Sequence, residues 1–111
     1  MSELNLITWI KENKMIYSKS NFGITLLPIN PLIAHFYIKI YQTDNWPESF
    51  QYNLYIYPTN SYDLRNQLQL KYGNFILGRF VKTFYNLNNL INEIHELNTI
   101  NIKKVKKVKK K

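Results

Sequence analysis

Two stretches of alternating residues decide the fold of this 111-residue chain: AHFYIKIY at residues 34–41 and FQYNLYIY at residues 50–57. Apolar side chains occupy every second position in both stretches, which is the period of a β-strand with one buried face. The segment between them, residues 43–48, should form a loop, so the two strands should pair antiparallel. The positions predicted to face the core are Ala34, Phe36, Ile38, Ile40, Phe50, Tyr52, Leu54 and Ile56.

The sequence before these strands predicts one helix and two short extended segments. Ser2 is a favourable N-cap for a helix that runs to about Asn13 with an apolar stripe along it. Short strands are expected at residues 15–17 and 23–27, with a turn between them. The second strand should end at Pro28, because proline cannot donate a hydrogen bond to a ladder.

Residues 64–72 are compatible with two structures. Apolar and polar side chains alternate as in a strand, but Leu64 and Leu68 also fit a helical stripe. Ser61 would cap such a helix and Gly73 would end it. Of these two alternatives, the alternation favours a strand.

The C-terminal part of the fold is predicted to be a strand followed by a helix. Gly73-Asn74 would form a tight turn, and residues 75–84 are apolar on both faces, as in a central strand. Asn86 is a favourable cap for a last helix, whose apolar stripe continues to Leu97.

Together these elements predict an α+β fold, with an antiparallel sheet of about five strands, an N-terminal helix and a C-terminal helix. Residues 1–102 would form a single globular domain, followed by a disordered lysine-rich tail at residues 103–111. The composition agrees, because 45% hydrophobic and 15% aromatic residues exclude disorder of the whole chain. The absence of cysteine excludes disulfides and thiolate metal sites. No cofactor and no metal are expected.

The tail is the first candidate binding element. It contributes seven of the eight net positive charges, which leaves +1 for residues 1–102. Such a segment could neutralise phosphates of a nucleic acid with release of their counterions, although anionic lipid, an acidic protein or a purely solubilising role also fit it. The candidate residues are Lys103, Lys104, Lys106, Lys107, Lys109, Lys110 and Lys111.

The polar face of the predicted sheet is the second candidate. Tyrosine rings offer stacking surfaces for bases and lysines follow the phosphates, as in proteins that bind single strands without reading sequence. Tyrosine also favours strands in general, so the same pattern fits an ordinary solvent-facing sheet or one covered by the N-terminal helix. The candidate residues are Tyr37, Lys39, Tyr41, Tyr55, Tyr57, Arg65 and Lys71.

These candidates predict an accessory protein that binds nucleic acid non-specifically, with single-stranded DNA or RNA favoured. The alternative is a protein-binding module, an inhibitor, an adaptor or a homodimer, with Trp46 and Phe50 in an aromatic anchor patch. An enzyme is not expected. The weak exception is a metal-dependent nuclease, in which Asp63 would join a strand containing Gln69-Leu70-Lys71.

The sequence shows no signal peptide and no uninterrupted apolar stretch of about 20 residues, so we expect an intracellular, cytoplasmic protein without a membrane span. Asn, Ile, Lys and Tyr account for 51 of the 111 residues. With the lysine tail and the lack of cysteine, this composition resembles that of small orphan proteins of A/T-rich crenarchaeal filamentous and rod-shaped viruses. That group includes small DNA-binding proteins, nucleases and inhibitors of host defence, so the resemblance implies a viral accessory protein in the host cytoplasm.

Overall fold

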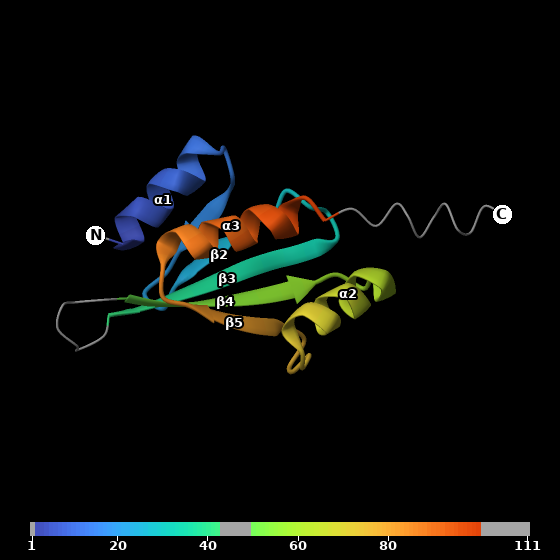
Figure 1. The fold of residues 1–111 in the computed structure, drawn as a ribbon. Coiled ribbons are helices and arrows are strands. Elements are labelled where there is room, and N and C mark those ends of the chain that lie inside the picture. Colours follow the sequence, from blue (N-terminus) through green and yellow to red (C-terminus); the bar gives the residue numbers. More distant parts are fainter. Residues whose placement is uncertain (1, 43–49, 101–111) are drawn as a thin grey trace.

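Five strands pair antiparallel in chain order, β1-β2-β3-β4-β5, and make one open sheet (Figure 1). The structure is a computed structural model that describes residues 2–42 and 50–100. Three helices accompany the sheet: α1 precedes it, α2 lies between β4 and β5 in the chain, and α3 follows it. This arrangement confirms the predicted α+β fold. The elements are α1 (Ser2–Glu12), β1 (Tyr17–Lys19), β2 (Ile24–Leu26), β3 (Ile33–Gln42), β4 (Phe50–Pro58), α2 (Tyr62–Tyr72), β5 (Phe80–Phe84) and α3 (Leu87–Asn98).

Two of the helices, α1 and α3, lie on one face of the sheet (Figure 1). α1 and α3 cross above the strands, and α2 lies at the β5 edge, where its Lys71 pairs with Glu96 of α3. Burial of apolar side chains between the two layers is the main favourable term in folding. The fully buried side chains of this core include Leu6, Ile10, Phe36, Ile38, Leu54, Ile56, Leu64, Phe80 and Ile94.

The pairing of β3 with β4 is the longest in the sheet and confirms the predicted antiparallel pair. One core position was predicted wrongly. The register shifts between Ile33 and His35, so that Ile33 is buried and Ala34 is exposed. A bulge of this kind inserts one residue into a strand and moves side chains to the other face, which the regular alternation of the sequence did not reveal.

The first strand also differs from the prediction, because β1 begins at Tyr17 rather than at residue 15. Met15 instead closes α1: its N–H donates to the carbonyl of Ile10 at 3.1 Å, and its side chain is buried in the core. The strand can therefore start only after the chain has left the helix.

Residues 64–72 are helical, so the prediction of a strand there was wrong. The Ser61 hydroxyl accepts a hydrogen bond from the Leu64 N–H at 3.2 Å, which caps α2. Gly73 ends the helix with φ at +89°, in the left-handed region that glycine adopts without strain. Leu64 and Leu68 are buried from one face of α2, and this burial fixes the helical period.

The strand predicted over residues 75–84 is shorter than expected and lies at the sheet edge. β5 covers only Phe80–Phe84, and its three central residues are exposed. The tight turn is formed by Leu77-Gly78, between the bridged residues Ile76 and Arg79, instead of Gly73-Asn74. The chain reaches β5 through α2, so no hairpin is needed at the earlier position.

The C-terminal helix forms as predicted, with Asn86 accepting hydrogen bonds from the N–H groups of Asn88 and Asn89 at 2.8 and 3.2 Å. A buried amide then fixes the end of this helix to the loop before β3. Asn30 donates through Nδ2 to the carbonyl of Leu97 at 2.9 Å. Within the described ranges, none of the helices has both the length and the apolar character to cross a bilayer.

Candidate functional site

The face of the sheet turned away from the helices is the main candidate site, and we call it the open face. No helix of residues 2–42 and 50–100 covers it (Figure 1). The β3 and β4 register places Tyr37 opposite Tyr55 and His35 opposite Tyr57. The residues of the open face on these two strands are His35, Tyr37, Lys39, Tyr41, Gln51, Asn53, Tyr55 and Tyr57.

The aromatic side chains of the open face contact each other across the two strands. The rings of His35 and Tyr57 are stacked, with centroids 4.2 Å apart and 14° between their planes. The rings of Tyr37 and Tyr55 are tilted by 51°, with centroids 6.0 Å apart. Such contacts leave the rings half-buried and hold them in place, so a flat partner meets an ordered aromatic surface.

A glycine allows Tyr37 to lie against the neighbouring strand. A β-carbon placed on Gly23 would lie 2.9 Å from both Cζ and Oη of Tyr37, closer than such atoms approach in proteins. Gly23 precedes β2 and is itself buried. The absence of a side chain at this position therefore shapes the open face, a role that the sequence pattern did not indicate.

Two cations belong to the open face. Lys39 extends from β3 and was predicted to do so. Arg79 was missed: its guanidinium carbon lies 5.0 Å from the centre of the Tyr55 ring, and its buried Nε has no hydrogen-bond partner among the described residues. Arg79 falls within the apolar stretch expected as a central strand, and only the register of β5 shows that it reaches this face.

The acidic residues of the described ranges are confined to the helices. Every carboxylate of the described residues lies on a helix, whereas the strands carry only lysines as charged residues. Among residues 2–42 and 50–100, the open face therefore has two cations and no acidic side chain, so an anion meets no like charge from these residues. The acidic residues of α1, α2 and α3 whose side chains the structure describes are Glu12, Asp63, Glu93 and Glu96.

His35 adds a titratable group to the open face. Burial lowers its pKa below the ordinary value of 6.5, so the ring is neutral at pH 7. A neutral imidazole stacks on Tyr57 without an added charge. A nearby phosphate would favour the protonated form, which makes the charge of this ring responsive to an anionic ligand.

Arg65 and Lys71 are not part of the open face, because the segment that carries them is helical. Lys71 is paired on the other side of the sheet, with its Nζ 2.8 Å from Glu96 Oε1, and this hydrogen bond raises the pKa of Lys71. The guanidinium of Arg65 lies 5.1 Å from the centre of the Phe75 ring. The predicted placement of both residues on the sheet face was therefore wrong.

The ion pair between Lys71 and Glu96 is part of a contact between α2 and α3. Tyr72 donates a hydrogen bond from its hydroxyl to Glu93 Oε2, and Glu93 also lies 3.5 Å from Lys71 Nζ. Burial raises the pKa of Tyr72, and the bond to Glu93 raises it further. These groups satisfy each other and are structural.

The aromatic anchor patch proposed around Trp46 and Phe50 is only partly within the structure. Trp46 and the lysines of residues 103–111 lie outside the described residues. Phe50 is half-buried and packs against the core. It is therefore not a freely projecting anchor.

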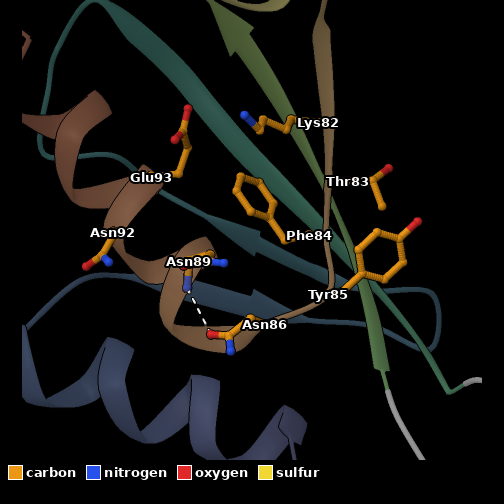
Figure 2. A pocket seen from close by; sticks show the side chains of 8 residues that line it. All are labelled: Lys82, Thr83, Phe84, Tyr85, Asn86, Asn89, Asn92 and Glu93. Atoms are coloured by element: carbon orange, nitrogen blue, oxygen red, sulfur yellow. Dashed lines mark hydrogen bonds between the residues drawn. The ribbon is translucent and has the colours of Figure 1, made fainter.

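A depression of about 450 Å³ lies between β5 and α3 (Figure 2). Lys82 and Phe84 point toward α3, and the Lys82 Nζ lies 5.5 Å from the centre of the Phe84 ring. Asparagines line the helix side, and Glu93 is already held by Tyr72 and Lys71. Among the residues that line the depression, no nucleophile is paired with a base.

The nuclease arrangement is also not formed. Asp63 and Lys71 lie in the first and last turns of α2, about 12 Å apart along the helix axis at the usual rise per residue. Gln69-Leu70-Lys71 is helical and not on a strand. Across residues 2–42 and 50–100, the structure brings together no group of three or more His, Asp or Glu side chains that could hold a metal ion.

Comparison of this chain with protein-family models, with curated proteins and with solved structures gives no match in any of the three. The candidate site therefore depends on the geometry of the open face alone.

Proposed function

We propose that this protein binds single-stranded nucleic acid without sequence preference through the open face, with the lysine tail adding electrostatic attraction. The observation that supports the proposal is a sheet face on which ordered aromatic rings alternate with Lys39 and Arg79 and to which the described part of the chain adds no acidic side chain. An intracellular location, where such a ligand occurs, is part of the proposal.

The chemistry of the face favours a flat, anionic partner. Rings of Tyr55 and Tyr57 can stack on bases, and stacking contributes about 1–3 kcal/mol per base regardless of sequence. Lys39 and Arg79 can contact phosphates, which gives affinity that decreases with salt. Few side chains of the face, mainly Gln51 and Asn53, could read base edges, so sequence discrimination should be weak.

A single strand fits better than a duplex. The bases of a duplex are stacked on each other, and their π-faces are not available to a sheet surface. The open face is a surface with aromatic rings on two neighbouring strands, so it can contact more than one base of an extended strand. Its half-buried, cross-strand-supported rings lose little conformational entropy on binding.

Fluorescence anisotropy with a labelled single-stranded oligonucleotide, measured from about 50 mM to 300 mM salt, tests the proposal. Two matched pairs of variants locate the binding face. Tyr55→Leu should weaken binding about 5- to 100-fold, whereas Tyr62→Leu, on α2, should not. Lys39→Ala should reduce the slope of affinity against salt, whereas Lys11→Ala removes the same charge from α1 and should leave the slope unchanged.

Circular dichroism and urea unfolding should show that all four variants remain folded. Lack of binding at about 50 mM salt contradicts the proposal, because phosphate contacts are strongest there. Equal losses for both members of a pair also contradict it, because the open face would then have no special part in binding. Tighter binding of a duplex than of the single strand would replace stacking with backbone contacts as the mode of recognition.

A further inference from the structure

A strained apolar turn projects from the edge of the sheet just before β5. Ile76 and Arg79 are bridged through backbone hydrogen bonds of 3.0 and 3.2 Å, with Leu77 and Gly78 between them. Both central residues have positive φ, +56° for Leu77 and +80° for Gly78. A two-residue turn of this type favours Asn-Gly, because a side chain with a branched carbon skeleton is strained in the left-handed region.

The fold does not compensate for the strain at Leu77. Its side chain is 77% exposed, and the neighbouring Ile76 is 58% exposed. Lys14, the other described residue besides glycine with positive φ, differs because it ends α1 and directs Met15 into the core. Leucine at position 77 therefore contributes neither an easy turn nor burial against residues 2–42 and 50–100, which points to a contact with something else.

The turn is connected directly to the open face. Arg79 is the last residue of the turn, and its guanidinium lies over the Tyr55 ring. Arg79 also precedes Phe80, which pairs with Ile56, so the turn extends beyond the end of the face that carries Tyr57. A nucleic-acid strand bound along the open face would reach the turn next.

We infer that Leu77 is an apolar wedge, which inserts between neighbouring bases of the nucleic acid bound on the open face. This inference rests on the proposed function. Apolar side chains inserted between bases partly unstack them and gain contact with their faces. A narrow turn with Leu77 at its tip and Arg79 at its base combines an apolar contact to bases with a cation for the adjacent phosphate.

Leu77→Asn tests the inference, because asparagine suits the left-handed backbone and removes the apolar side chain. The melting temperature should rise by about 3–6 °C, since the strain is relieved. Affinity for the single-stranded oligonucleotide should fall about 5- to 20-fold, with an unchanged salt slope because no charge is lost. Leu77→Met keeps an apolar side chain and should retain most of the affinity. The matched control is Leu70→Asn, which makes the same exchange at a 91% exposed position on α2 and should not change affinity.

The outcomes separate this inference from the proposed function. If Tyr55→Leu weakens binding but Leu77→Asn does not, the wedge is wrong and the binding face stands. If neither variant weakens binding, the proposed function fails. Equal losses for Leu77→Asn and Leu70→Asn would overturn the wedge, because the effect would be unspecific. A Leu77-dependent association with anionic vesicles, without an effect on oligonucleotide binding, would also overturn it and assign the turn to a lipid surface.

Discussion

Replacing Gly23 by alanine should destabilise the sheet and displace one ring of the open face. The added β-carbon would lie 2.5 Å from the carbonyl oxygen of Ile38 and 2.9 Å from Cζ and Oη of Tyr37. The Tyr37 ring can rotate away, but the Ile38 oxygen belongs to the backbone of β3. Relief of this contact therefore requires β2 and β3 to separate locally.

The backbone would have to move by about 0.5 Å or more to reach even a tight contact, and overpacking of this kind costs about 1–3 kcal/mol. The position is next to the Ile24 and Ile38 pair, where β2 joins the sheet. We therefore expect a loss of about 2 kcal/mol in the free energy of unfolding, which is a large share of the 5–15 kcal/mol typical of a domain. With an m-value of about 1–1.5 kcal/mol/M, the urea midpoint should fall by about 1.5 M.

Urea unfolding followed by circular dichroism measures the change. Gly78→Ala is the control, because its φ of +80° imposes backbone strain but nothing lies within 4 Å of the added carbon, so the cost should be nearer 1 kcal/mol. The double variant Gly23→Ala/Tyr37→Ala should recover only the part of the lost free energy of unfolding that comes from the contact with the Tyr37 ring. A midpoint of Gly23→Ala within about 0.3 M of the unchanged protein would refute the reasoning, because it would mean that β2 can shift freely.

Three further predictions concern other parts of the molecule. Asn30→Ala should lower the free energy of unfolding by about 2–3 kcal/mol in urea, because the buried carbonyl of Leu97 loses its donor. The lowered pKa of His35 means that protonation favours the unfolded chain, so stability should decrease as the pH falls below 6.5. Bound phosphates should oppose this shift, so affinity should increase from pH 8 to pH 6, and His35→Gln should remove that dependence in anisotropy titrations. Deletion of residues 103–111 should flatten the salt dependence of binding without changing the melting temperature.

The parts of the fold that could be predicted have a single strong period of apolar residues and clear residues that begin or end the element. β3 and β4 alternate over eight residues, and α3 combines an asparagine cap with a regular apolar stripe. Residues 64–72 fit both the period of a strand and the period of a helix, and the prediction from alternation alone was wrong. Their composition favours the helix, because Leu, Arg, Gln and Lys are good helix formers and the segment contains no β-branched residue. Propensity and the Ser61 cap together should outweigh a short alternation.

The candidate site was predictable to the same extent as the strands that carry it. Tyr37, Tyr55 and Tyr57 were placed correctly on one face because alternation on β3 and β4 determines the face directly. Lys71 was misplaced because its segment was misassigned. Arg79 could not be found, because its position depends on how β5 pairs with β4 after a helix of 11 residues, and this register is a long-range property.

The placement of the described acidic residues on the helices has a consequence for how binding should depend on salt. Residues 1–102 carry a net charge of only +1, yet a small total does not make each face neutral, because the acidic residues of the described ranges all lie on helices. At physiological ionic strength, attraction is screened within about 8 Å, so the lysine tail acts only on a strand that is already near it. Contacts at the surface of the sheet must then keep the nucleic-acid strand bound. Salt should therefore weaken the contribution of the tail and of Lys39 while leaving the stacking on Tyr55 nearly constant.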